Sequence, residues 1–169
     1  MVITYHGNEH FRAQSGDLII AIDPFRKIKA DITIRLNSKE TGNETEGLLI
    51  DHPGEYEIKE TRIWGAPGMY ILEAEEMRIA LFGREFKGFG EDADKYLQMI
   101  DMAIVPAEVK MAQYLRQLKP SLIITCSEHQ ELNKFLQELG QTGAEAQEKL
   151  TIKKKELTPE AMKVVVLRG

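Results

Sequence analysis

The side chains best suited to chemistry in this chain are its histidines and a few acidic residues. Imidazole and carboxylate groups bind zinc and related ions, and a bound ion activates water for hydrolysis. One interpretation is a metal site assembled from scattered positions. The candidates for it are His6, His10, Asp23, His52 and Glu55. Their spacing matches no known ligand signature, so the favoured interpretation places them in turns, with His129 at an exposed early position of a helix.

The segment Gly54-Glu55-Tyr56-Glu57 places two glutamates around a tyrosine. A glutamate buried beside a tyrosine could act as a general base. The favoured alternative is structural: Pro53 and Gly54 form a turn, and the acidic side chains hydrogen-bond the backbone around it.

Arg84 is followed by Glu85 and Lys87, and this basic group could hold a small anion. The planar guanidinium fork of arginine suits carboxylate and phosphate groups. The favoured alternative is that Arg84 neutralises a carboxylate of the same pocket, such as Asp23.

Cys126 lies three residues before His129 and could act as a nucleophile. Such a cysteine needs a base and an acid that orients the base, and no orienting acid is evident. A small buried residue at the end of a strand is therefore the favoured role for Cys126.

The elements that must position these residues differ between the two halves of the chain. Alternating and short apolar runs predict strands over residues 2–5, 11–14, 18–22, 31–36, 47–50 and 56–64, then a hairpin of 68–74 and 77–82. The second half alternates between buried strands and helices. Strands are predicted over 102–105, 122–125, 151–157 and 164–167, and helices over 92–100, 108–118 and 127–139. Ser127 and Gln130 fit a capping box for the last helix, and Gly140 fits its end.

A strand-rich half followed by strand–helix alternation predicts an α/β (α+β) fold. Two packed sheets with helices outside would form an αββα four-layer sandwich. The chain has 169 residues, which suits a single domain over residues 1–169. Lys153, Lys154 and Lys155 are expected to protect a sheet edge.

Composition excludes several classes of function. The net charge of −5 argues against nucleic-acid binding, which needs a basic surface. The single cysteine excludes an internal disulfide framework and fits a reducing cytoplasm. The first residues do not form a signal peptide, and no apolar run is long enough to span a membrane. We therefore expect a cytoplasmic protein without membrane or nucleic-acid partners.

Six segments, in order, resemble a single family. They are ITYHG (3–7), IAIDPF (20–25), HPGEYEI (52–58), MYILE with RIA (69–73 and 78–80), ID with AIVP (100–101 and 103–106) and LKP with II (118–120 and 123–124). They are similar to the metallo-β-lactamase fold superfamily, in particular its short bacterial branch of Zn-dependent hydrolases related to the ascorbate-phosphate lactonase-like proteins. HPGEYEI, similar to the family's GPGEYE turn, is the most specific match. The resemblance covers residues 1–140 and implies a metal-dependent hydrolase ancestor.

The positions at which this resemblance would place metal ligands hold other residues. The family's H-x-H-x-D-H box should follow the strand that ends at Leu36, but the polar loop of residues 37–47 contains no histidine. An early family histidine aligns with Asn8, the bridging aspartate with Arg84, and the last histidine with Ser127. A guanidinium group cannot ligate zinc.

These losses predict a metal-free relative that is non-catalytic and acts as a binding or assembly module. No cofactor is expected, and the candidates for its vestigial pocket are His6, His10, Asp23, His52, Glu55, Arg84 and Ser127. Two alternatives stay open: a metal-dependent hydrolase with a rebuilt site, and a sensor of small anions centred on Arg84. A homo-oligomer, a small anionic ligand or a protein partner would each be compatible with the sequence.

Overall fold

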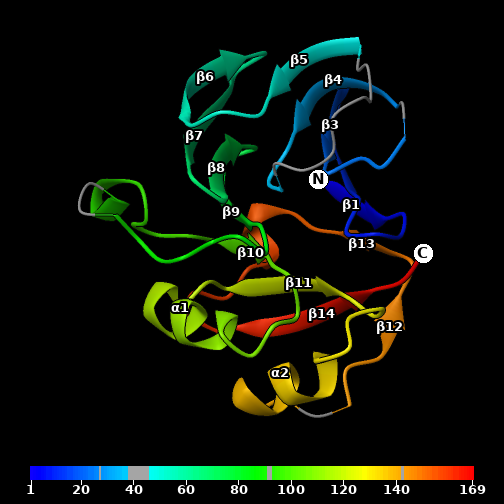
Figure 1. Ribbon diagram of the computed structural model, residues 1–169, viewed down its shortest axis with the longest axis vertical. Helices are drawn as coiled ribbons and strands as arrows, with labels where there is room; N and C mark the ends of the chain where they lie inside the picture. Colours follow the sequence, from blue (N-terminus) through cyan, green and yellow to red (C-terminus); the bar gives the residue numbers. More distant parts are fainter. Residues whose placement is uncertain (27, 38–45, 91–92, 142) are drawn as a thin grey trace.

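The strands form two sheets that pack face to face (Figure 1). The computed structural model describes residues 1–26, 28–37, 46–90, 93–141 and 143–169. The first sheet has the order β13 (Lys149–Thr151), β1 (Val2–Tyr5), β2 (Phe11–Ser15), β3 (Leu18–Ile22), β4 (Lys29–Ile34), β5 (Glu46–Ile50). The second has the order β12 (Ala146–Gln147), β14 (Lys163–Leu167), β11 (Leu122–Cys126), β10 (Met102–Ile104), β9 (Met77–Phe82), β8 (Met69–Ala74), β7 (Thr61–Ala66), β6 (Gly54–Ile58).

The main core lies between the two sheets. Alternating residues of the first sheet, such as Ile3, Ile20 and Ile32, are fully buried there because successive side chains of a strand point to opposite faces. Leu72 and Ile79 meet them from the second sheet. The two-residue alternation read from the sequence therefore identifies the face that is buried.

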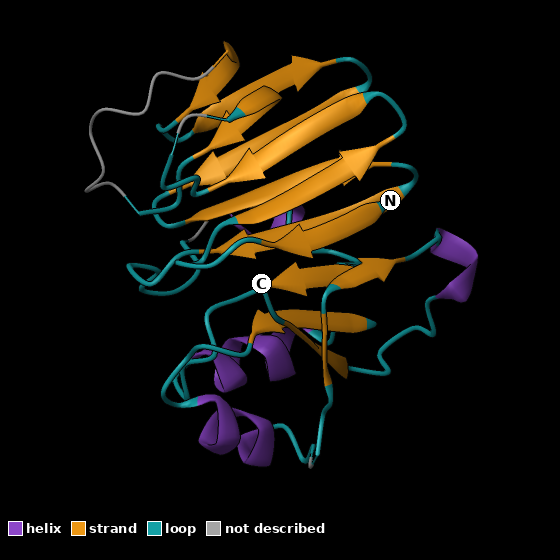
Figure 2. Ribbon diagram, turned by 90° about the vertical axis from the view of Figure 1, so that its right-hand side faces the viewer, coloured by secondary structure: helices purple, strands orange, loops and turns teal. Residues whose placement is uncertain are grey.

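The two α-helices form a second core on the outer face of the second sheet (Figure 2). They are α1 (Met111–Leu118) and α2 (Leu132–Glu138). Leu115 and Phe135 are fully buried against this sheet. None of the described helices has the length and apolar character needed to cross a membrane.

Strand direction brings the chemistry-bearing loops to one edge of the sandwich. In the first sheet β3, β4 and β5 run parallel, and in the second sheet β9, β10, β11 and β14 run parallel. Parallel strands place their carboxyl ends together, which is where ligands bind in open α/β sheets. We call the segments that follow β3, β4, β9, β10 and β11 the loop edge.

The predicted helices are shorter than the sequence pattern suggests. The 127–139 prediction is wrong at its start, because α2 begins at Leu132 without a side-chain cap. Ser127 instead donates its backbone N–H to Leu167 O at 2.8 Å, so it continues the sheet. Gly140, with a φ of 69°, does follow the helix. Of the 92–100 prediction, the described part contains only the 3₁₀ turn η1 (Ala93–Lys95), and residue 92 lies outside the described residues.

Two strand predictions are also corrected. Residues 56–64 are the hairpin β6–β7, because Lys59 and Glu60 have φ values of 46° and 63° and turn the chain. Gly54 begins β6 and is not part of a turn. The 151–157 strand ends at Thr151, and the 3₁₀ turn η2 (Lys154–Glu156) follows it. The three lysines at 153–155 therefore lie at this turn, where Lys154 pairs with Asp101.

Candidate functional site

The loop edge contains a small two-part pocket. Its inner part has a volume of about 20 Å³ between Asp23, Asn37 and Cys126. Its outer part, of about 200 Å³, opens between Glu9, Asp23 and Arg84. The structure therefore brings together two of the predicted pocket residues, Asp23 and Arg84.

Asp23 follows β3 and is held by donors from the end of β4. Its carboxylate accepts bonds from Leu36 N at 2.8 Å, from Asn37 N at 3.4 Å and from Asn37 Nδ2 at 2.9 Å. Burial raises the pKa of Asp23 to about 6, and these bonds oppose that rise. The acceptor positions that a metal would use on Asp23 are therefore engaged by the chain itself.

Arg84 closes the pocket from the second sheet. Its Nε donates to Glu9 Oε1 at 2.6 Å, and its backbone N–H donates to Asn37 Oδ1 at 3.1 Å. Gly83 makes this approach feasible, since a Cβ there would lie 3.0 Å from Leu36 Cβ. The bond to Glu9 raises the pKa of Arg84, so the guanidinium group stays charged. Asp23, Asn37, Arg84 and Glu9 thus form one network, which we call the edge network.

The sulfur of Cys126 lies beneath this network beside Tyr5. Tyr5 OH donates to Glu128 Oε2 at 2.9 Å and accepts a bond from Glu9 N at 3.3 Å. Burial raises the pKa of the Cys126 thiol, which disfavours the reactive thiolate. The geometry agrees with a buried strand-end residue.

His6 and His10 form a pair at the β1–β2 turn, with ring centroids 5.1 Å apart. His10 is only 1% exposed, and burial lowers its pKa to about 4. His6 also has a lowered pKa, caused by burial and by the charges of Arg12 and Arg26. These rings are therefore neutral, and the two cationic side chains oppose a metal ion at the pair.

His52, Glu55 and Ser127 do not line the pocket at the loop edge. The side chain of His52 is 81% exposed and contacts Asp51. Glu55 lies on the outer face of the second sheet, where Tyr96 OH donates to it at 2.6 Å. The exposed position predicted for His129 is wrong, because its side chain is 10% exposed.

The residues at the loop edge do not fit a zinc ion. Such a site needs about four nitrogen, sulfur or oxygen ligands, and its thiol and carboxyl ligands must be deprotonated. Within the described ranges, no group of three or more histidine, cysteine or acidic side chains is close enough to hold a metal. Arg35 and Arg84 line the same opening, and their positive charges oppose a cation. Residues 38–45 of the loop expected to replace the first metal box lie outside the described residues.

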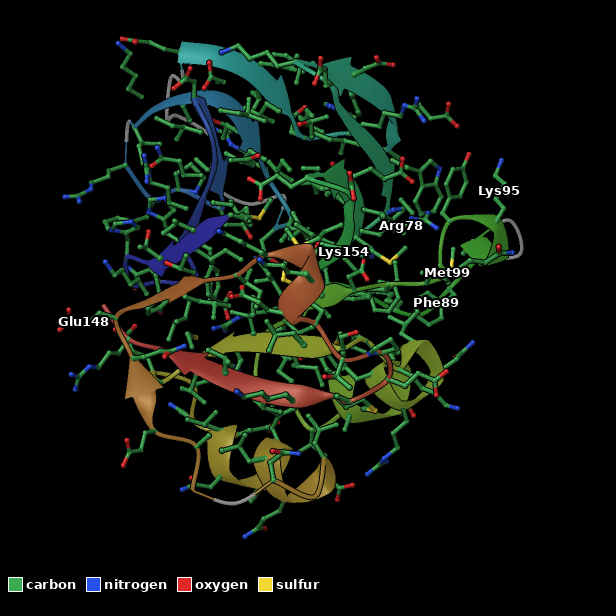
Figure 3. All side chains as sticks on the ribbon, turned by 180° about the vertical axis from the view of Figure 1, so that it is seen from behind. Arg78, Phe89, Lys95, Met99, Glu148 and Lys154 are labelled. Atoms are coloured by element: carbon green, nitrogen blue, oxygen red, sulfur yellow. The ribbon has the colours of Figure 1, made fainter. Side chains whose placement is uncertain are left out.

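A larger concave surface lies on the outer face of the second sheet beside β6. This outer groove has a volume of about 570 Å³ and is lined by Glu55, Glu57, Trp64 and Tyr96, among others. The rings of Trp64 and Tyr96 stack with centroids 3.9 Å apart and planes at 14°. Figure 3 shows Lys95 and Met99 projecting from the segment that holds Tyr96, and Met99 is 83% exposed.

Sequence reasoning did not identify this groove. Trp64 and Tyr96 lie far apart in the chain, so no local pattern joins them. Sequence reasoning also missed Asn37 and Glu9 as members of the edge network. Asn37 had one available signal, since it is the first polar residue after an apolar strand, where binding residues often lie.

The fold and the position of the loop edge define the class of structure as the metallo-β-lactamase fold. A Zn-dependent hydrolase of the metallo-β-lactamase superfamily from Thermotoga maritima superposes with a TM-score of 0.80 over 100% of both chains, at 20% identity. A metallo hydrolase from the hyperthermophilic archaeon Ignicoccus hospitalis gives a TM-score of 0.58 at 13% identity, over 90% of this chain and 99% of that chain. No family model and no curated protein sequence matches the chain.

These neighbours confirm the predicted α/β (α+β) class and the metallo-β-lactamase fold that the resemblance implied. Three of the four predicted layers are present in the described residues, because both α-helices pack on the second sheet. At such low sequence identity the likeness concerns the fold, and a fold alone does not determine a function.

Proposed function

We propose that the protein is a metal-independent, non-catalytic binding module built on the metallo-β-lactamase fold. The edge network is the observation that carries this proposal. It engages the polar side chains that line the loop edge in bonds between Asp23, Asn37, Arg84 and Glu9, and it places a guanidinium group beside the acidic side chains. A hydrolytic zinc site needs that position open, with a free coordination place for water.

The edge network also connects the two sheets. Asp23 and Asn37 follow strands of the first sheet and Arg84 follows a strand of the second, so the bonds that line the pocket also join the sheets. Side chains that were only remnants of an older site would not be expected to have such complementary hydrogen-bond partners. This complementarity supports a structural role for the loop edge.

The experiment is metal analysis of protein purified without a histidine tag. We expect substoichiometric zinc, manganese and iron, and a melting temperature unchanged by a chelator or by added zinc, because a bound metal would stabilise the native state. Stoichiometric metal that is lost in Asp23→Asn or His52→Ala would overturn the proposal and support the rebuilt-site hydrolase. His129→Ala, outside that candidate set, is the matched control.

A sensor of small anions is the second candidate function. It is favoured by the presence of Arg35 and Arg84 in the lining of one opening of about 200 Å³. A thermal-shift screen with phosphorylated sugars and carboxylates tests it. Stabilisation that is lost in Arg84→Ala but kept in Arg116→Ala, on helix α1, would support this role, and stabilisation that persists in Arg84→Ala would refute it.

A further inference from the structure

The free edge of β6 combines unpaired backbone groups with an acidic face. β6 is the last strand of the second sheet, and no described strand pairs with its outer side. Figure 1 shows β6 and β5 at the same end of the sandwich, each at the limit of its sheet. An unprotected sheet edge is a template for pairing with another extended chain.

The register of the β6–β7 hairpin identifies the backbone groups that face outward. Ile58 pairs with Thr61 across the two-residue turn, and Tyr56 pairs with Ile63. In such a hairpin the pair that flanks the turn is hydrogen-bonded, and bonded and non-bonded pairs then alternate. The N–H and C=O groups of Glu55 and Glu57 therefore point away from β7, toward the free edge.

The two faces of β6 differ in chemistry. On the outer face, the side chains of Glu55 and Glu57 line the outer groove. Among the described residues Glu57 has no hydrogen-bond or ion-pair partner. On the inner face, Tyr56 and Ile58 are half-buried and pack with Leu48 of β5 against the main core. An added strand would therefore place every second side chain beside carboxylates and the others beside apolar residues.

Two of the three cationic side chains that line the groove have close contacts. Arg78 contacts Glu73 at 3.1 Å and donates to Tyr96 O at 2.7 Å, and Lys95 Nζ lies 4.4 Å from the centroid of the Tyr96 ring. Arg62 is 73% exposed, lies 3.9 Å from Glu73 and is the residue of β7 directly opposite Glu57. Because β6 is the outer strand, Glu55 and Glu57 lie nearer to an incoming strand than Arg62 does.

The charges of Glu55 and Glu57 favour one kind of pairing strand over another at this edge. A second copy paired antiparallel about Tyr56 would set Glu55 directly opposite Glu57 of the other chain, and like charges opposite each other destabilise a sheet. A strand with basic residues at those positions would gain opposite-charge pairs instead. Charge complementarity therefore favours a different, basic partner.

We infer that the β6 edge docks an extended segment of a partner protein in which basic and apolar residues alternate. The segment adds a strand to the second sheet through the backbone of Glu55 and Glu57. Its basic side chains lie beside these two glutamates over the outer groove, and its apolar side chains extend the layer of Tyr56 and Ile58. This inference names a partner class for the binding role proposed above and rests on it.

A titration with short synthetic peptides tests the inference. The probe is a capped peptide of alternating lysine and valine, and its matched control has the same composition arranged in one lysine block and one valine block. We expect binding of the alternating peptide, slower hydrogen exchange of the Glu55 and Glu57 amides, and weaker binding at high salt. Glu57→Pro removes an edge N–H that β7 does not use, and proline is tolerated in edge strands.

We expect Glu57→Pro and the double variant Glu55→Lys/Glu57→Lys each to weaken binding by about tenfold or more. The control variant Glu145→Lys/Glu148→Lys makes the same charge change on either side of β12, the strand at the opposite end of the second sheet from β6, and should bind like the wild type. Figure 3 labels Glu148 at this end. Absent binding, equal binding of the block peptide, or unchanged binding by both β6 variants would overturn the inference. A protein dimer that is lost in Glu57→Pro would assign the edge to a second copy and would also overturn it.

Metal analysis and peptide binding are separate measurements. Stoichiometric metal would refute the proposed function whatever the peptides do. A metal-free protein that does not bind the alternating peptide would be compatible with the proposed function and would refute only the inferred partner class.

Discussion

The loop edge and the β6 edge are two rims of the same sandwich with opposite properties. At the loop edge, Asp23 accepts bonds from Leu36 and Asn37, and Arg84 is bonded to Glu9, so the polar groups satisfy one another. At the β6 edge, backbone groups face outward without a strand partner in the described part of the chain. The polar groups of one rim are bonded to one another, whereas the outward backbone groups of the other rim have no strand partner among the described residues.

This difference between the two rims indicates which of them is suited to stabilising the fold and which to binding. Filling a pocket with complementary side chains stabilises the native state, because buried polar groups then have partners. The outward backbone groups of an edge strand have no partner within the sheet and remain available for recognition. Changes at the loop edge should therefore affect stability, whereas changes at the β6 edge should affect binding.

The largest expected effect concerns the protonation of Asp23. Its pKa is raised from 3.8 to about 6, so the native state takes up a proton at higher pH than the unfolded chain does. Native stability attributable to this group therefore rises as the pH falls from 7 to 4. The free energy of unfolding of the wild type minus that of Asp23→Asn should increase by about 2.5 kcal/mol over this range. Urea unfolding at several pH values measures it.

Asp31 provides a control of opposite sign. The bond from Lys59 lowers its pKa below 3.8, so its stabilising contribution is present above that value and is lost as the pH falls. The difference between the wild type and Asp31→Asn should therefore decrease in acid. A flat or decreasing difference for Asp23→Asn would contradict the buried, closed loop edge.

The second effect is the loss of Asn37. Its side chain donates to Asp23 at 2.9 Å and accepts from Arg84 N at 3.1 Å, which joins the two sheets. Asn37→Ala should lower the free energy of unfolding by about 2 kcal/mol, because it removes a bond to a partly buried carboxylate. Gln113→Ala, at an exposed position of α1, removes an amide of the same kind and should change stability little. Equal effects of the two variants would break the comparison.

The smallest effect is expected in the outer groove. Tyr96→Phe removes the hydroxyl that donates to Glu55 at 2.6 Å and keeps the ring that stacks on Trp64. We expect a loss of about 0.5 kcal/mol, because the bond is exposed to solvent. Tyr114→Phe is the matched control, since Tyr114 packs through its ring against Phe86 and Phe89. A loss as large as that of Asn37→Ala would show that the groove is a structural element.

The sequence predicted the strands well where apolar and polar side chains alternate, because burial in the core then fixes which face of the strand points inward. Ile3, Ile20 and Ile32 show this, because their burial follows from a two-residue period. Helix starts were predicted poorly. Ser127 has the residue type of a cap, but its backbone N–H donates to Leu167 O just beyond the end of β11, and α2 begins only at Leu132. A partner forty residues away overrides a local signal of this kind.

The candidate site was predicted only in part, because some of its contacts follow from strand direction and others from the packing of distant segments. Asp23 and Arg84 meet because both follow parallel strands, and this could be anticipated from the resemblance. Glu9 and Asn37 complete the network through contacts that depend on the packing of two sheets. His52 and Glu55 were grouped with them because their segment resembles a loop at that edge, but His52 is exposed and Glu55 lies within β6 on the outer face of the second sheet.

The last strands of the chain determine when folding can finish during synthesis. β12 and β13 are separated only by Glu148, yet β12 pairs in the second sheet and β13 in the first (Figure 3). Ile3 of β1 can pair only after Leu150 has been synthesised, and the side of β11 that faces away from β10 can pair only after β14 has been synthesised. Contacts between such distant positions slow folding. The first sheet is therefore complete only after β13 has left the ribosome and the second only after β14 has, and until then the nascent protein exposes strand edges on both.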